Sequence, residues 1–202
     1  MFIVLEGLDG SGKSTQANIL SKNLTNMKIS NICTCQPTKS PIGIMAREHT
    51  QGKGDNLQNE TVGLLFAADS IQHLTNQIAP ALLQGQFVVC DRYYYSNMAY
   101  QGVDDIALER VINYNQVSME IGKPDITFFL DVLPETCMAR IAANREEFSI
   151  FDTLPRLTKL RERYMASFNR LKATENIVII NGDTKSQDEI SHEILGHIQA
   201  LQ

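Results

Sequence analysis

The sequence predicts an α/β fold, a doubly wound five-stranded parallel sheet flanked by helices. Five short runs rich in Val, Ile, Leu and Phe alternate with longer segments of helical spacing or helix-forming composition. Continuous apolar runs are typical of parallel strands that helices cover on both faces. A glycine-rich loop follows the first run directly, and sheets of this kind bind ligands at the carboxyl ends of their strands.

The elements follow from these runs in chain order. The first strand reads Phe-Ile-Val-Leu, the second Ile-Ser-Asn-Ile-Cys-Thr-Cys and the third Phe-Val-Val-Cys. The fourth reads Ile-Thr-Phe-Phe-Leu and the fifth Ile-Val-Ile-Ile, and helical segments separate all five. The predicted strands are residues 2–5, 29–35, 87–90, 126–130 and 177–180. The predicted helices are residues 13–26, 61–83, 105–122, 153–172 and 187–200.

Composition narrows the class of protein. The chain has 202 residues and no Pro-, Gly- or Ser-rich stretch, so we expect residues 1–202 to form one domain. Its formal charge is −5 with both signs scattered, which leaves no electrostatic footprint for a nucleic acid polymer. Glu6 interrupts the first apolar run, and no other run approaches membrane-spanning length. We therefore expect a cytoplasmic protein without a membrane partner.

The four cysteines do not predict a metal site. Cys33 and Cys35 are separated by one residue, and no matching pair follows them. Cys33 and Cys90 lie in predicted strands, where we expect their thiols to pack as small apolar groups. The remaining cysteine is Cys137.

Residues 7–14 fit the phosphate-binding pattern G-x-x-x-x-G-K-[ST] at the end of the first strand. Glycines allow successive backbone N–H groups to face one anion, and the start of the next helix adds its positive dipole end. Lys13 would reach the outer phosphates, and the Ser14 hydroxyl would bind Mg²⁺. The residues expected to hold a nucleoside triphosphate are Gly7, Leu8, Asp9, Gly10, Ser11, Gly12, Lys13, Ser14 and Thr15.

The third strand ends in Asp91, followed by Arg92. A carboxylate there would lie beside the phosphate loop and hold Mg²⁺ or its water shell. The planar fork of an arginine suits a pair of phosphate oxygens better than a lysine does. Both residues belong to the string D-R-Y-x-x-S-x-x-A-Y-Q-G over residues 91–102.

This string, read with residues 6–16, resembles the thymidylate kinase family, which phosphorylates dTMP to dTDP with ATP and Mg²⁺. The resemblance includes Pro37-Thr38, residues 41–43, residues 64–69 and Lys123-Pro124-Asp125. It implies a P-loop nucleoside triphosphate hydrolase type of fold with a short lid, and it covers most of the chain.

The resemblance also implies roles for individual residues at the acceptor site. Asp9 would accept a hydrogen bond from the sugar 3′-hydroxyl, and Phe66 would stack on the pyrimidine. Arg92 and the more weakly matched Lys39 would contact the acceptor phosphate. Asn97 would read the base edge, and Tyr100 would pack against C2′ of the sugar. Without the family, core packing on helix 61–83 is the alternative for Phe66. Tyr93, Tyr94 and Tyr95 are expected in the core.

Phosphoryl transfer needs positive charge around the transferring group. Family members carry an extra arginine either in the phosphate loop or in a mobile lid, and this loop has Gly10 and Ser11 instead. The lid is therefore expected at about residues 140–156, with Arg145 as the transition-state arginine and Arg140 against the adenine. Phe151 and Asp152 align with an aromatic-acid pair near the nucleotide. A solvated helix face with Arg/Glu pairs is the alternative for both arginines.

Two departures from the family concern the base. Ser70 stands where relatives commonly have an arginine that reaches the base oxygen O4, and Cys35 stands where an arginine often precedes the proline step. Losing a charged donor could cost about 1.5–3 kcal/mol of selectivity unless Gln36, Asn97 or Gln101 replaces it. Acceptors such as dUMP, dCMP or a deoxynucleoside therefore remain alternatives.

Two further readings stay open. A nucleotide-binding switch is disfavoured because the sequence has no N-K-x-D string and no D-x-x-G after the third strand. A catalytically silent relative is disfavoured because Lys13, Ser14, Asp91 and Arg92 are all present. The resemblance implies a homodimer packed through helices, although the apolar content of helix 61–83 equally suits burial within one subunit.

Overall fold

Five parallel strands form a single sheet in the order β2-β3-β1-β4-β5 in the computed structural model, which describes residues 1–53, 57–102, 106–144 and 153–201. The predicted fold class is confirmed, and each predicted strand agrees with the structure to within two residues at either end. The strands are β1 (Phe2–Gly7), β2 (Asn31–Cys35), β3 (Phe87–Asp91), β4 (Ile126–Asp131) and β5 (Ile177–Asn181).

Helices connect and cover these strands. The predicted helix 61–83 is divided by a π-helical turn, η1, because Pro80 has no N–H to continue the regular ladder. The sequence analysis missed α2, α5 and α7, although Ser40 and Pro41 form a helix-start signal for α2. The helices are α1 (Lys13–Asn26), α2 (Pro41–Thr50), α3 (Asn59–His73), η1 (Leu74–Ile78), α4 (Ala79–Leu83), α5 (Tyr94–Gly102), α6 (Leu108–Ile121), α7 (Pro134–Asn144), α8 (Leu154–Leu171) and α9 (Gln187–Gln199).

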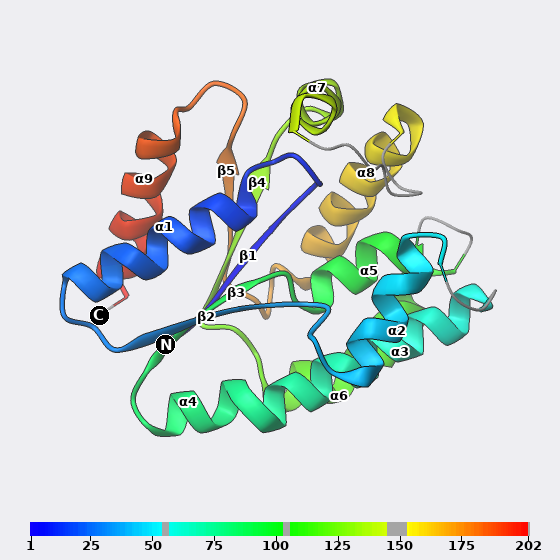
Figure 1. Ribbon diagram of the computed structural model, residues 1–202, viewed down its shortest axis with the longest axis horizontal. Coiled ribbons are helices and arrows are strands. Elements are labelled where there is room, and N and C mark those ends of the chain that lie inside the picture. The colour runs from blue at the N-terminus through cyan, green and yellow to red at the C-terminus, as the bar shows by residue number, and fades with distance from the viewer. Residues whose placement is uncertain (54–56, 103–105, 145–152, 202) are drawn as a thin grey trace.

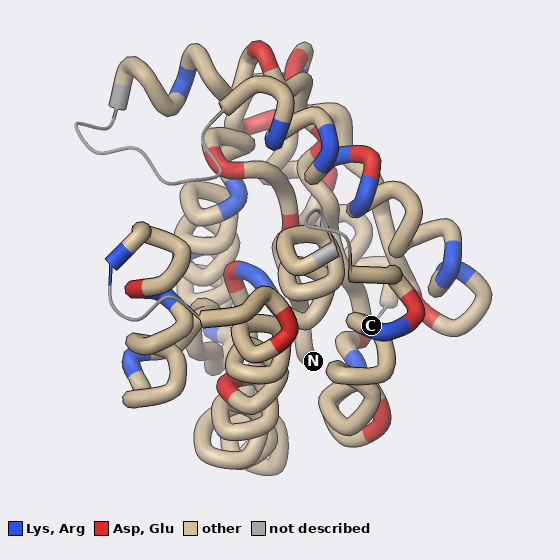
Figure 2. The backbone as a smooth tube through the Cα atoms, turned by 90° about the vertical axis from the view of Figure 1, so that its right-hand side faces the viewer, with Lys and Arg blue, Asp and Glu red and all other residues tan. Residues whose placement is uncertain are grey.

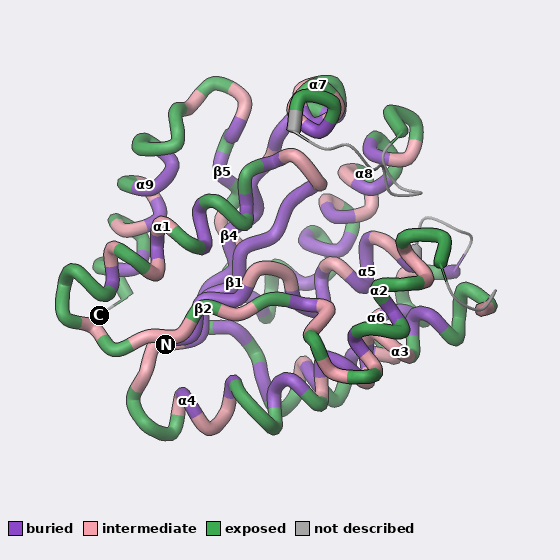
Figure 3. Tube along the Cα trace, in the orientation of Figure 1, coloured by how far each residue is buried: buried purple, intermediate pink, exposed green. Residues whose placement is uncertain are grey.

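Alternate residues of each buried strand serve two different cores. In β1, Ile3 and Leu5 pack with α1 and α9, whereas Phe2 and Val4 pack with η1, α4, α5 and α8. Figure 1 shows α1 and α9 on one side of the sheet and α5, α6 and α8 on the other. Figure 3 shows the buried strands enclosed between these layers, with exposed residues on the outer sides of the helices. Burial on both faces explains why the strands read as continuous apolar runs.

The chain leaves two neighbouring strands toward opposite faces. The connection from β1 enters α1 on one side, while that from β3 enters α5 on the other, and β1 and β3 are paired in the sheet. Such a switch point opens a crevice at the carboxyl ends of the two strands. The phosphate loop and Asp91-Arg92 both lie there.

The tyrosine and cysteine predictions have different outcomes. Tyr93, Tyr94 and Tyr95 are fully buried, as expected. Cys90 is buried, but the expectation for Cys33 is wrong, because it lies on the edge strand β2 and is exposed. An edge strand has a neighbour on one side only, so its side chains are less completely covered.

In the backbone view of Figure 2, acidic and basic positions are interspersed along the traced elements. Within the described ranges, no helix combines the length and apolar composition needed to cross a lipid bilayer.

Candidate active site

A cavity of about 860 Å³ lies at the carboxyl ends of β1 and β3. Most of the residues predicted from the sequence line it. They are Asp9, Gly10, Ser11, Gly12, Lys13, Ser14, Thr15, Phe66, Asp91, Arg92, Asn97, Tyr100 and Arg140.

Three of the described predicted residues do not contribute to this lining. Gly7 is the last residue of β1 and Leu8 follows it, and Leu8 is fully buried. Lys39 is exposed and does not line the cavity, so its contact with an acceptor phosphate stays a prediction. Arg145 lies outside the described residues, as do Phe151 and Asp152.

The phosphate loop needs glycine at two positions. Gly10 has φ +81°, and a Cβ there would lie 2.6 Å from the carbonyl oxygen of Cys137 on α7. Gly12 has φ +94° and immediately precedes α1, whose start has no side-chain cap. The first N–H groups of α1 are thus available to an anion, as a phosphate-binding helix start requires.

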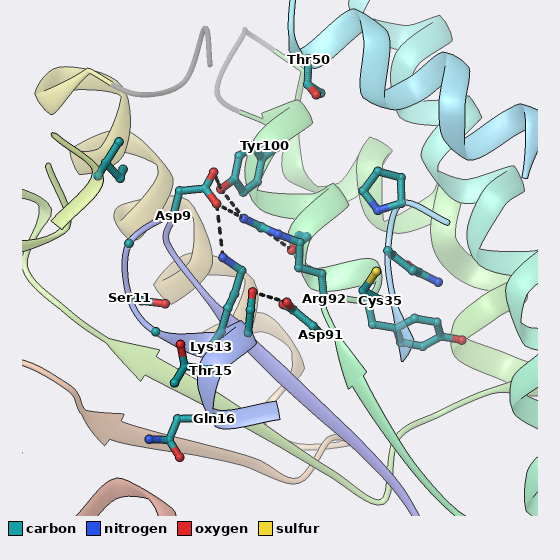
Figure 4. Close-up of a pocket in the computed structure, with 18 of the residues that line it drawn as sticks. Asp9, Ser11, Lys13, Thr15, Gln16, Cys35, Thr50, Asp91, Arg92 and Tyr100 are labelled. Atoms are coloured by element: carbon teal, nitrogen blue, oxygen red, sulfur yellow. Dashed lines mark hydrogen bonds and ion pairs between the residues drawn. The ribbon is translucent and has the colours of Figure 1, made fainter. Parts of the chain in front are cut away.

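Asp9 joins the two cations of the site. Its Oδ1 accepts hydrogen bonds from Lys13 Nζ at 3.3 Å and from Arg92 Nη2 at 2.7 Å. Its Oδ2 accepts one from the Tyr100 hydroxyl at 3.2 Å. Figure 4 shows this carboxylate between the loop lysine and the arginine that follows β3. Asp9, in the loop that follows β1, therefore contacts both the lysine expected to bind the phosphate donor and the arginine expected to bind the phosphate acceptor.

Arg92 is held in a demanding conformation. It has φ +72°, which is rare for a non-glycine residue and is typical of functional sites. Its Nη1 donates to Ser96 Oγ at 3.0 Å, and its guanidinium carbon lies 4.9 Å from the centre of the Tyr100 ring. Burial opposes its charge, but the surrounding groups, Tyr100 and Asp9 foremost, together more than offset this, so the pKa of Arg92 is raised and the side chain stays protonated.

Glu6 is linked to Arg92 through Ser96, a role that the sequence analysis missed. This carboxylate is fully buried and accepts hydrogen bonds from the backbone N–H of Tyr93 at 2.8 Å and from the Ser96 hydroxyl at 2.6 Å. The Tyr164 hydroxyl donates to it at 2.9 Å. Burial raises the pKa of Glu6, while Arg92 and these hydrogen bonds act in the opposite direction. A charged residue that ends a buried apolar strand was the available signal.

Ser14 and Asp91 lie together beside the phosphate loop, where Mg²⁺ is predicted. The Ser14 hydroxyl donates to Asp91 Oδ2, which joins the start of α1 to the end of β3. Asp91 Oδ1 is buried and has no hydrogen-bond partner in the described part of the chain. A hydroxyl beside an unpartnered carboxylate oxygen, both lining a phosphate cradle, is a donor set that fits Mg²⁺ or one of its waters.

Arg140 of α7 contacts the phosphate loop at Gly10. Its guanidinium donates to the carbonyl of Gly10 at 3.4 Å and to the carbonyl of Gly182 at 3.2 Å, after β5. It therefore connects the phosphate loop with the segment that leads into α9. Lys185 of that segment also lines the cavity and was not predicted.

The opposite wall combines an aromatic ring with amide side chains. Phe66 and Ser70 lie one turn apart on α3 and both line the cavity. Asn97 is 3 % exposed, and its Nδ2 donates to the carbonyl of Gly63 at 3.0 Å. Its Oδ1 is buried without a partner among the described residues. An aromatic face with a nearby unpartnered acceptor suits a planar heterocycle that carries an N–H group.

Arg47 is a second missed cation at this wall. It lies on α2, lines the cavity, and donates to the carbonyl of Pro37. The sequence analysis missed it together with α2, although Ser40 and Pro41 signal the start of that helix.

Comparison with known proteins identifies close relatives. A model of a protein family described as thymidylate kinase matches residues 5–194. The chain is 37 % identical to a probable thymidylate kinase of Methanococcus aeolicus, covering 96 % of this chain and 93 % of the relative. It is 36 % identical to a probable thymidylate kinase of Methanocaldococcus jannaschii over 100 % and 97 % of the two chains. A thymidylate kinase of Leptospira borgpetersenii is 35 % identical, with 96 % and 91 % covered.

Proposed function

The chain belongs to the thymidylate kinase family, and on that basis we propose that it transfers the γ-phosphoryl group of ATP to dTMP, giving ADP and dTDP. The observation that carries this proposal is the shared contact of Lys13 and Arg92 with one oxygen of Asp9. A donor-side lysine and an acceptor-side arginine that reach the same atom would hold two phosphate groups next to each other.

At the donor end, the loop and Lys13 would bind the triphosphate, with Arg140 against the adenine. Ser14 and Asp91 would hold Mg²⁺. When bound, this ion would supply positive charge to the oxygens of the transferring phosphoryl group.

At the acceptor end, Phe66 would stack on thymine, and Asn97 Oδ1 would accept a hydrogen bond from N3–H. Tyr100 would pack on the sugar beside Asp9, and Arg92 would hold the phosphate. Lys39 is a further candidate for that phosphate. Catalysis would consist of positioning and charge neutralisation, with direct in-line transfer and no covalent enzyme intermediate.

The lid and the assembly extend the proposal. We propose that residues 1–202 act as one domain and that the lid at about residues 140–156 supplies Arg145 to the transition state. A homodimer is supported by exposed apolar side chains on neighbouring helices, among them Met45 of α2, Leu64 of α3 and Ile121 of α6. Sedimentation velocity tests it, since Leu64→Glu should shift a dimer toward monomer. A cytoplasmic location stays a prediction.

The experiment that tests the activity is a substrate panel. ADP formation is measured with dTMP, dUMP, dCMP and thymidine as acceptors, for the wild type and for Lys13→Ala. We expect dTMP to be preferred and Lys13→Ala to lose nearly all turnover while keeping a native melting profile, because Lys13 lies among the phosphate-binding groups. Near-normal turnover of Lys13→Ala would contradict the assignment. The family and the names of the relatives give no support to another acceptor or to a nucleotide switch.

A further inference from the structure

A chain of side-chain hydrogen bonds lies behind the base end of the cavity. The Ser70 hydroxyl donates to Gln36 Oε1 at 2.9 Å, and Gln36 Nε2 lies 3.1 Å from Nδ1 of His73. His73 Nε2 lies 2.8 Å from the Thr34 hydroxyl, which donates to Gln77 Oε1 at 3.2 Å. Ser70, Gln36 and His73 are each less than 9 % exposed.

The direction of each hydrogen bond in this series follows from the bond between Thr34 and Gln77 at its end. Thr34 has one hydroxyl proton and gives it to Gln77, so its oxygen accepts from His73 Nε2–H. In a neutral imidazole, Nδ1 is then an acceptor and requires the amide N–H of Gln36. Burial lowers the pKa of His73, which favours this neutral ring, although Asp69 and Gln77 oppose the shift. The orientation of the Gln36 amide is therefore fixed from both sides.

Among the described residues, this hydrogen-bond network leaves one amide N–H of Gln36 unused. Ser70 has used its only proton on Gln36, so it offers the cavity an acceptor. Gln36 Nε2 carries two protons, of which His73 takes one, and the second has no partner within the described residues. Gln36 also lines the cavity. The amide of Gln36, not the hydroxyl of Ser70, can thus donate to a ligand.

This donor and the Asn97 acceptor lie on either side of Phe66. Asn97 contacts Gly63, and Gln36 contacts Ser70, and both contacted residues belong to α3. Gly63 and Ser70 are seven positions apart, which corresponds to about 10 Å along the axis of α3, and Phe66 lies between them. A pyrimidine stacked on Phe66 would have an acceptor at one end of its edge and a donor at the other.

We propose that Gln36 is the specificity-determining residue for position 4 of the pyrimidine, donating its second amide N–H to O4, and that His73 positions it. The inference rests on the proposed function. Thymine presents N3–H and O4, which match the Asn97 acceptor and the Gln36 donor. Cytosine presents a bare N3 and an amino group, and it mismatches both. Relatives commonly have an arginine at the position of Ser70. In this chain, the neutral amide of Gln36, held in one orientation, would donate the hydrogen bond in its place.

Gln101 is the competing candidate. It lines the cavity and is 6 % exposed, but no side-chain hydrogen bond among the described residues fixes its amide. An amide without fixed orientation can offer either its oxygen or its nitrogen, so it discriminates poorly between O4 and an amino group.

The test compares dTMP with 5-methyl-dCMP, which differs from it only in the hydrogen-bonding edge. The measured quantity is the ratio of the two kcat/KM values. We expect Gln36→Glu, which replaces the donor by an acceptor, to lower this ratio about tenfold or more, and Gln36→Met to lower it less. Gln72→Glu adds the same charge at an exposed position of α3 and should leave the ratio unchanged.

A second pair of variants tests the positioning role without altering Gln36. His73→Phe removes the Nδ1 acceptor and should lower the ratio, whereas His73→Asn retains an acceptor facing Gln36 and should restore it. Melting temperatures identify any variant that fails to fold. Because this pair gives the same readout, loss of folding in a Gln36 variant leaves the test intact.

The outcomes separate this inference from the proposed function. An unchanged ratio in folded Gln36 and His73→Phe variants, or a ratio that responds only to Gln101→Met, would overturn the role of Gln36. A wild-type enzyme that phosphorylates no dTMP would instead overturn the proposed function.

Discussion

Arg92 Nη2 lies 2.7 Å from Asp9 Oδ1, although 83 residues separate them in the chain. The same oxygen accepts a hydrogen bond from Lys13. One carboxylate of the phosphate loop thereby contacts both cations, Lys13 and Arg92, that the proposed reaction would place on its two phosphates. Binding either nucleotide phosphate would compete with this carboxylate for its cation.

The fork of Arg92 is required because its two terminal nitrogens have different partners. Nη1 donates to Ser96, while Nη2 donates to Asp9 and Tyr100. Arg92→Lys keeps the charge but offers one nitrogen, so we expect KM for dTMP to rise at least about tenfold and kcat to fall. Steady-state kinetics at saturating ATP measure this, and KM for ATP serves as the control. A variant with unchanged KM for dTMP would remove Arg92 from the acceptor site.

Asp91 should set the magnesium requirement. Asp91→Asn removes the charge of the unpartnered Oδ1 while preserving the size of the side chain. We expect the Mg²⁺ concentration for half-maximal activity to rise about tenfold, because one anionic ligand or water acceptor is lost. Titration of Mg²⁺ at fixed ATP measures it. Equal Mg²⁺ dependence in variant and wild type would disprove this role of Asp91.

Arg145 should act on the chemical step. Arg145→Ala is expected to lower kcat at least a hundredfold at saturating nucleotides, because the phosphate loop has Gly10 and Ser11 in place of its own arginine. The measurement is kcat, with Arg140→Ala as a comparison that should affect mainly KM for ATP. An effect of Arg145→Ala confined to KM would contradict the transition-state role.

Gly10 should be critical for stability, and α9 offers a matched control. Gly10→Ala would combine φ +81° with a Cβ 2.6 Å from a backbone oxygen, and we expect it to lower the free energy of unfolding by about 1–3 kcal/mol. Gly196, in α9, has no atom within 4 Å of an added Cβ, so Gly196→Ala should raise stability by about 0.5–1 kcal/mol. Urea unfolding measures both. Equal effects of the two substitutions would refute the packing argument.

His73 should make the fold sensitive to acid. Burial lowers its pKa below the ordinary 6.5, so the unfolded chain binds a proton more readily than the native chain. The contribution of His73 to the free energy of unfolding should therefore be fully present above about pH 6.5 and fall as the pH drops toward the folded pKa, by at most about 1.4 kcal/mol per pH unit.

Urea unfolding at pH 7.5 and 5.5 tests this expectation, with His73→Asn as the control that should lack the acid-dependent part. Glu6 and Glu175 have raised pKa values and act in the opposite direction, so the wild type and the variant must be compared with each other. Identical pH dependence in the two proteins would show that His73 does not titrate in this way.

The sequence by itself determined the sheet and the position of the phosphate-loop motif at the end of its first strand. Continuous apolar runs specify strands buried on two faces, and the phosphate loop is one contiguous segment whose glycines and lysine are needed by local geometry. The long predicted helix was only approximately right, because Pro80 introduces a π-helical turn that apolar spacing does not reveal. Cys33 was misjudged because the position of a strand within a sheet depends on pairing and not on its own residues.

Only the tertiary structure decided how the cavity wall around Phe66, Ser70 and Asn97 is built. The Asn97 amide nitrogen donates to Gly63 of α3 and Asn115 of α6, which leaves its oxygen without a partner among the described residues. The amide of Gln36 is oriented by Ser70 and His73 of α3. Ser70 alone indicated a missing arginine. Which group replaces that arginine depends on hydrogen-bond partners from different elements, and such partners become neighbours only when the sheet and its helices are assembled.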